Sequence, residues 1–192
     1  SIVLTGGQSV LNLYKILSKS DSNWEKWHIY IGDERCVPMR HKDRNDRVIN
    51  EIWLDNSLIP KNNIHFIKAE LGLLEARVDY ENALKKINKF DVVLLSMGDD
   101  GHIASLFPGH LYSKNTDVVV EYNSPKPPNK RISISYRKLN KTHNVFKIIL
   151  GQPKRQAMSL LFRGHDLPIN RVYGEVEKIF IHSSAIPVGG EQ

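Results

Sequence analysis

The segment best suited to chemistry is a glycine-rich turn that holds an acid and a histidine. Residues 96–102 read SMGDDGH, so Asp100 stands two positions before His102. A carboxylate at that distance can orient an imidazole or stabilise its protonated form. An imidazole held in this way is suited to remove a proton from water. The turn therefore predicts His102 as a general base and Asp100 as its partner.

Two other kinds of chemistry fit this turn less well. Asp99, Asp100 and His102 are possible metal ligands, but their spacing matches no common zinc pattern, such as paired histidines beside a glutamate. Ser96 and Ser105 are nearby hydroxyls, but no G-x-S-x-G nucleophile elbow occurs in the chain. We therefore expect no catalytic metal and direct attack by activated water.

A second candidate segment, residues 5–9, reads TGGQS and stands between a predicted strand and a predicted helix. Gly6 and Gly7 allow the backbone to approach a ligand closely, and a helix N-terminus presents unpaired N–H groups. Ser9 can cap the helix or bind an anion. A simple turn with a serine cap is the alternative explanation of this pattern.

The third candidate segment is Asp33-Glu34-Arg35, which follows a predicted strand and Gly32. The guanidinium of Arg35 can make two parallel hydrogen bonds to a phosphate. A surface ion pair between the acids and Arg35 is the alternative. The position at the end of a strand favours a role in binding.

Apolar runs alternate with helical patterns along nearly the whole chain. The predicted strands cover residues 2–5, 27–31, 64–67, 90–95, 118–121, 131–136, 145–150 and 178–182. The predicted helices cover residues 9–18, 43–54, 73–87, 153–162 and a short stretch near 102–107, and residues 124–129 form a proline-rich loop. This order predicts an α/β fold with a mainly parallel sheet and helices on both faces. Right-handed crossovers then place the three candidate segments at the carboxyl edge, where ligands bind.

Composition predicts one soluble domain over residues 1–192, with 41% hydrophobic and 25% charged residues. The net charge of +6 fits a solvated basic surface or an electropositive mouth for an anionic substrate, and no nucleic-acid motif accompanies it. The single cysteine, Cys36, excludes a disulfide within the chain. The chain has no apolar run of about 18 residues, so no membrane helix is predicted. Nothing points to an oxidising compartment, and we expect a cytoplasmic protein. A start without Met, directly in an apolar run, predicts an N-terminally incomplete domain.

Taken together, the motifs resemble the 6-phosphogluconolactonase family. Residues 97–109, MGDDGHIASLFPG, resemble the signature of that family, and residues 33–38, DERCVP, with His41 and residues 43–45, resemble its second motif. Residues 6–9 resemble its phosphate-binding loop, and the segments around Arg131 and Lys154 resemble its later basic positions. The order and spacing agree across nearly the whole chain.

The resemblance implies a modified Rossmann-like fold and hydrolysis of 6-phospho-D-glucono-1,5-lactone to 6-phosphogluconate in the pentose phosphate pathway. It implies no cofactor, and a phosphorylated sugar lactone as the partner rather than nucleic acid or membrane; the oligomeric state stays open. His102 would be the base and Asp100 its partner. The residues expected at the phosphate or sugar are Gly6, Gly7, Ser9, Asp33, Arg35, Arg131 and Lys154.

Some positions depart from the family pattern, and two rivals remain. Gln8, Val10 and Arg44 differ from the usual residues, which affects the details of the phosphate loop. The related glucosamine-6-phosphate deaminases continue their Asp-Gly-His turn with Phe-Asn-Glu-Pro, whereas Phe107 replaces that acid here. The second rival is a non-catalytic sugar-phosphate-binding regulator, against which the intact Asp100 and His102 argue.

Overall fold

The structure, a computed structural model, describes residues 1–187. Strands and helices alternate along the chain as the apolar pattern predicts. The strands are β1 (Ile2–Leu4), β2 (Ile29–Ile31), β3 (Asp33–Arg35), β4 (Ile64–His65), β5 (Phe90–Ser96), β6 (Val118–Glu121), β7 (Arg131–Ile134), β8 (Thr142–Ile149) and β9 (Val176–Ile181). The helices are α1 (Leu11–Leu17), α2 (Asn45–Ile52), α3 (Leu73–Leu84), α4 (Tyr136–Leu139) and α5 (Arg155–Phe162).

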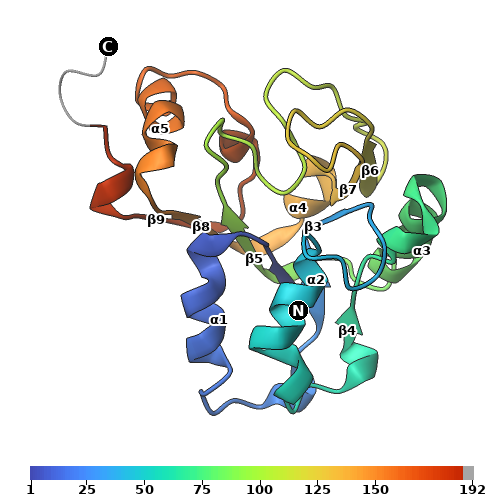
Figure 1. The fold of residues 1–192 in the computed structure, drawn as a ribbon. Coiled ribbons are helices and arrows are strands. Elements are labelled where there is room, and N and C mark those ends of the chain that lie inside the picture. The colour runs from blue at the N-terminus through green and yellow to red at the C-terminus, as the bar shows by residue number, and fades with distance from the viewer. Residues whose placement is uncertain (188–192) are drawn as a thin grey trace.

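Six strands form a parallel sheet in the order β4-β2-β1-β5-β8-β9. Helices α1 and α2 cover one face, and α3, α4 and α5 lie on the other side (Figure 1). Each face has its own apolar core, one around Tyr14 and Trp53 and one around Tyr80 and Phe90. The predicted α/β fold, with a mainly parallel sheet between helices, is confirmed.

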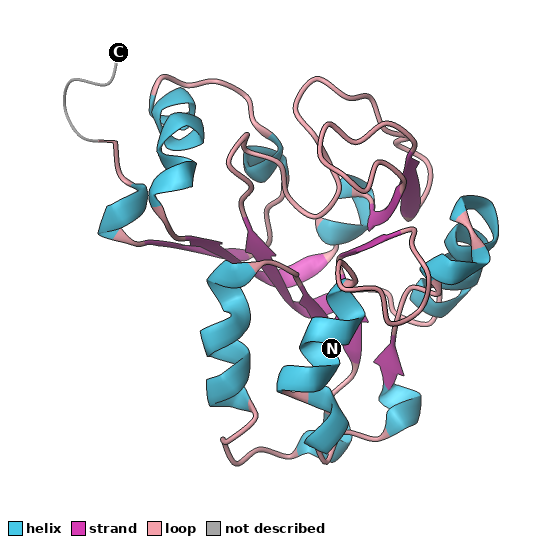
Figure 2. Cartoon of the chain, viewed as in Figure 1, coloured by secondary structure: helices cyan, strands magenta, loops and turns pink. Residues whose placement is uncertain are grey.

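A second, three-stranded antiparallel sheet, in the order β3-β7-β6, was not predicted. The chain passes from β2 through Gly32 directly into β3. Figure 2 shows the strands of the structure in magenta between the cyan helices. Asp33 pairs with Ser133 and Arg35 pairs with Arg131. Residues 33–35 are therefore a strand and not the expected loop, because β7 supplies a partner that is distant in sequence.

The short helix expected near residues 102–107 is wrong. Ile103 makes isolated bridges to Met97 and Leu106, and Ala104 adopts a positive φ of 48°. The apolar residues Ile103, Leu106 and Phe107 have helical spacing, but all three are buried in a tight turn between the two sheets. Their burial, rather than a helical face, explains the pattern.

Helix α4 also differs from the expectation, because the predicted strand over residues 131–136 ends at Ile134. The side chain of Ser135 accepts a hydrogen bond from the N–H of Lys138, which is a helix N-cap. Among the described residues, no helix is both long enough and apolar enough to cross a membrane.

Candidate active site

The strand order reverses at β1, because the chain runs from β1 through β2 to β4 and then returns to β5 on the other side. Such a switch point opens a crevice at the carboxyl ends of the two central strands. A cavity of about 380 Å³ lies there. Its wall includes eight of the nine predicted site residues: Gly6, Gly7, Ser9, Asp33, Arg35, His102, Arg131 and Lys154.

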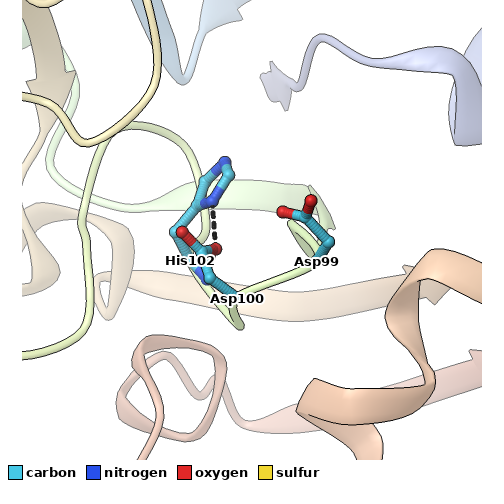
Figure 3. A group of neighbouring side chains, drawn as sticks. All are labelled: Asp99, Asp100 and His102. Atoms are coloured by element: carbon cyan, nitrogen blue, oxygen red, sulfur yellow. Dashed lines mark hydrogen bonds and ion pairs between the residues drawn. The ribbon is translucent and has the colours of Figure 1, made fainter.

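The ninth residue, Asp100, does not line the cavity but binds His102. Its Oδ1 accepts a hydrogen bond from the backbone N–H of His102 at 3.0 Å and lies 2.5 Å from the ring Nδ1 (Figure 3). Burial acts to raise the pKa of Asp100, but the hydrogen bond and charge of His102 together lower it. The carboxylate therefore occupies Nδ1, and Nε2 is the ring nitrogen left to act on a ligand.

Two neighbours determine where the His102 ring lies. A Cβ on Gly98 would stand 2.1 Å from both Nδ1 and Cε1 of the ring, so only glycine fits there. The Phe107 ring packs with its centroid 4.7 Å from that of the imidazole. Since Phe107 is buried, the position where the deaminases carry an acid is apolar in this protein.

Strand β3 explains why Asp33 and Arg35 both line the cavity, while Glu34 does not. Alternate residues of a strand point to the same side. Glu34 therefore points the opposite way, and its carboxylate accepts the N–H groups of Asn45 and Asp46 at 2.8 and 2.9 Å. Glu34 thus caps the N-terminus of α2, and the surface ion pair considered as an alternative does not form.

Asn45 connects these residues, and the sequence analysis did not single it out for the site. Its amide donates to the Oδ1 of Asp33 at 3.1 Å, and its oxygen accepts from Nη1 of Arg35 at 2.9 Å. The Nε of Arg35 is buried without a hydrogen-bond partner in the described part of the chain. An anion in the cavity would supply the partner that this donor lacks. Ser105, which is buried, donates to Oδ2 of Asp33 at 2.6 Å, so its hydroxyl is already engaged.

The loop after β1 approaches its neighbours closely. A Cβ on Gly6 would lie 2.0 Å from Oδ1 of Asn45, and Gly7 has a φ of 93°. Ser96, at the end of β5, donates to the carbonyl of Gly6 at 3.1 Å and so joins the two strand ends. Ser9 does not cap the following helix, because no side-chain hydrogen bond caps that turn. Ser9 lines the cavity, and its expected contact with an anion stays a prediction.

The basic residues form the remaining wall. The guanidinium of Arg131 donates to the carbonyls of Lys126, Pro127 and Pro128 at 2.9, 3.3 and 3.0 Å. Arg131 therefore braces the proline-rich loop as well as facing the cavity. Burial lowers the pKa of Lys154, although the charge of Asp100 acts to raise it. Lys126, which was not predicted for the site, also lines the cavity.

The one group of possible metal ligands found among the described residues is Asp99, Asp100 and His102, whose ligand atoms lie within 4.8 Å of one another (Figure 3). Each already has a partner of another kind. Asp100 binds the Nδ1 of His102, and Asp99 forms an ion pair with Lys126. The contacts of this cluster are a His–Asp hydrogen bond and a neighbouring Lys–Asp ion pair.

A larger cavity of about 1070 Å³ lies between α2 and β4, away from His102. It borders Arg44, whose guanidinium already binds Asp46, Glu70 and the carbonyl of Ile67. The smaller cavity is the candidate active site, because its wall holds several cations and an imidazole that binds an acid partner.

Fold and cavity together define a class of protein: a Rossmann-like α/β protein with a basic cavity beside a His–Asp pair. Residues 1–181 match the family model described as glucosamine-6-phosphate isomerases/6-phosphogluconolactonase. The chain belongs to this family, and the recognition made from its motifs is confirmed.

Similar proteins agree with this assignment. The chain is 33% identical over 201 residues to "6-phosphogluconolactonase 3, chloroplastic" of Arabidopsis thaliana, covering 94% of this chain and 62% of that protein. It is 31% identical to the 6-phosphogluconolactonase of Thermotoga maritima, covering 93% and 82%. The crystal structure of the Thermotoga maritima enzyme superimposes with a TM-score of 0.88, covering 94% of this chain and 84% of that one. The chain thus spans less than two thirds of the plant relative.

Proposed function

We propose that this protein hydrolyses 6-phospho-D-glucono-1,5-lactone to 6-phosphogluconate, a step of the pentose phosphate pathway. The single observation that carries the proposal is the cavity at the β1–β5 switch point, where His102, backed by Asp100, shares a wall with Arg35 and Lys154. The names of the similar proteins supply the reaction. The residues supply a base for the lactone and cations for the phosphate.

The proposed reaction begins with a water molecule between His102 and the lactone carbonyl. Nε2 of His102 removes a proton as the water oxygen attacks the carbonyl carbon. Asp100 stabilises the imidazolium that forms, because its carboxylate holds Nδ1 at 2.5 Å. Breakdown of the tetrahedral intermediate breaks the bond to the ring oxygen, and His102 returns its proton to that oxygen. No metal or cofactor takes part in this scheme.

The negative charge on the carbonyl oxygen needs hydrogen-bond donors. The backbone N–H groups of Gly98 and Gly101 do not serve this role, because they donate to the carbonyls of His102 and Gly98. The phosphate, held by Arg35 and Lys154, would keep the carbonyl within reach of the base.

The residue at position 107 argues against the rival deaminase reaction. Ring opening and isomerisation need further proton transfers, and the related deaminases place an acid where this chain has a buried phenylalanine.

We also propose that residues 1–192 form one domain, with the terminal residues 188–192 outside the described part. We propose a cytoplasmic location, which fits a chain with a single cysteine, although the plant relatives carry chloroplastic names.

The test is a lactonase assay with freshly prepared 6-phosphogluconolactone, corrected for spontaneous hydrolysis. The expected result is hydrolysis well above background, with no ammonia released from glucosamine 6-phosphate. Ammonia release without lactone hydrolysis would assign the deaminase reaction instead. Binding of 6-phosphogluconate without either activity would indicate the non-catalytic regulator.

A further inference from the structure

Lys126 lines the cavity, but the function proposed above gives it no task. It belongs to the proline-rich loop of residues 124–129, which connects β6 to β7. Its ammonium group forms an ion pair with the carboxylate of Asp99, the residue directly before Asp100. Lys126 therefore reaches from one wall of the cavity to the turn that carries His102.

The loop holds the backbone of Lys126 firmly. The hydroxyl of Ser124 accepts the N–H of Lys126 at 3.2 Å and donates to its carbonyl at 2.8 Å. Nη2 of Arg131 donates to the same carbonyl at 2.9 Å. Both Ser124 and Arg131 are buried. The peptide groups around Lys126 are thus anchored, whereas its side chain is held by one acid.

The ion pair between Lys126 and Asp99 is weak. The side chains of Lys126 and Asp99 are 34% and 49% exposed. Ion pairs this exposed to water contribute about 0–1 kcal/mol to stability. A ligand that carries more negative charge than one carboxylate can therefore take the ammonium group from Asp99.

The surroundings of Lys126 favour such a ligand. Burial lowers the pKa of Lys126, and the charges of Lys154 and Arg131 lower it further. Three cations thus stand close together beside the cavity, with Asp99 as the acid paired with Lys126. A phosphate dianion placed among them would relieve their mutual repulsion and make charge-assisted hydrogen bonds.

We propose that Lys126 binds the phosphate of the substrate. In the ligand-free protein, Asp99 holds the ammonium group of Lys126 across the cavity. The inference rests on the proposed function and adds a specificity residue to it. When substrate enters, the ammonium group exchanges Asp99 for the phosphate. Asp99, which competes for Lys126 and repels the phosphate, then opposes binding.

The test compares Lys126→Met with Lys130→Met, a matched control on an exposed lysine outside the cavity. Loss of one charge-assisted contact should raise KM for 6-phosphogluconolactone about tenfold or more in Lys126→Met, with kcat little changed. Hydrolysis of unphosphorylated glucono-1,5-lactone should be equal in both variants. Asp99→Asn should lower KM for the phosphorylated substrate a few-fold.

Three results would overturn the inference: an unchanged KM in Lys126→Met, an equal loss with both lactones, or a loss in Asp99→Asn as large as that in Lys126→Met. A purely structural role would lower Tm and affect both lactones alike. We expect an unchanged Tm, because the contacts of Ser124 and Arg131 are made to the backbone of Lys126 and survive the substitution.

Calorimetric titration with 6-phosphogluconate separates this inference from the proposed function, because it needs no turnover. A wild-type protein that binds 6-phosphogluconate through Lys126 but hydrolyses no lactone would contradict the function alone. An active wild type whose affinity for 6-phosphogluconate is the same in Lys126→Met would contradict the role of Lys126 alone. A protein that neither binds nor hydrolyses would contradict both.

Discussion

The imidazole of His102 lies so close over Gly98 that no methyl group fits between them. A Cβ built on Gly98 would stand 2.1 Å from Nδ1 and Cε1 of the ring. The same ring contacts Phe107 on another side and Asp100 at Nδ1. The position of the proposed base is therefore determined by three neighbours, and the glycine sets the closest of these limits.

Gly98→Ala should reduce lactone hydrolysis by more than tenfold, because the added methyl group displaces the imidazole from Asp100. A misplacement of about 1 Å in a reacting group can reduce a rate about a hundredfold. Steady-state kinetics should show the loss mainly in kcat. Gly164→Ala is the control, since Gly164 has a φ of 81° but open space around its Cβ position. That variant should lose about 1 kcal/mol of stability and keep its activity.

His102→Ala should abolish hydrolysis above the spontaneous background, while circular dichroism stays close to that of the wild type. General base catalysis contributes about a hundredfold to ten-thousandfold, and the ring is partly exposed at the cavity. His165→Ala, at an exposed site outside the cavity, is the matched control and should be fully active. Full activity in His102→Ala would remove the residue from its proposed role.

Asp100→Asn should lower kcat about ten- to a hundredfold and leave KM little changed. The amide keeps the shape of Asp100 but loses the negative charge that stabilises the imidazolium, and a charge-assisted hydrogen bond is worth about 1.5–3 kcal/mol. Stopped-flow or steady-state rates at constant pH provide the measurement. An equal rise in KM would instead indicate that Asp100 contacts the substrate.

The same variant gives a prediction about stability and pH. The folded-state pKa of Asp100 is lower than its ordinary value of about 3.9, since the contacts of His102 outweigh the effect of burial. Ionisation of Asp100 therefore stabilises the folded protein above about pH 4, and this contribution is lost as the pH falls through the lowered pKa. The Tm of wild type should exceed that of Asp100→Asn at pH 7, and the difference should shrink at pH 3.

The meeting of the three loops was predictable from the sequence, because it depends on the strand order and on the carboxyl edge of the sheet. The alternation of strands and helices determines both. Gly6, Arg35 and His102 share one cavity for that reason. The sheet β3-β7-β6 was not predictable in the same way. Strand β3 is short, and its partner β7 lies about a hundred residues further along the chain, so no local pattern marks the pair.

Residues that act through long-range contacts were also missed. Asn45 belongs to the second motif but was given no role at the site, and only the folded chain brings it between Asp33 and Arg35. Lys126 stands in a proline-rich segment that predicts a loop and nothing more. Its place at the cavity depends on Arg131, whose side chain binds three carbonyls of that loop.

Arg35→Ala should raise KM for the phosphorylated lactone about ten- to a hundredfold, with a smaller effect on kcat. Nη1 of Arg35 donates to the carbonyl of Asp43 and to Oδ1 of Asn45. Its buried Nε has no hydrogen-bond acceptor among the described residues. Arg35→Lys should recover only part of the affinity, because an ammonium cannot make two parallel hydrogen bonds. An unchanged KM in Arg35→Ala would contradict phosphate contact by this residue.

Arg131 and Lys154 were predicted together as anion contacts, but their surroundings predict different phenotypes. Arg131→Met should lower Tm by about 4–8 °C, because loop carbonyls lose their donor at a cost of about 2 kcal/mol. Its KM should rise as well, since the loop carries Lys126. Lys154→Met should raise KM without a comparable loss of Tm.

Thermal unfolding and steady-state kinetics of the two variants, measured side by side, distinguish bracing from direct binding. The burial of Arg131 and its three carbonyl partners are the basis for the expected loss of stability. Glycerol or another osmolyte that restores the fold should recover part of the affinity of Arg131→Met and none of that of Lys154→Met. If Arg131→Met instead keeps its Tm and loses only affinity, the guanidinium binds the anion directly, and the loop is stable without the contacts of Arg131.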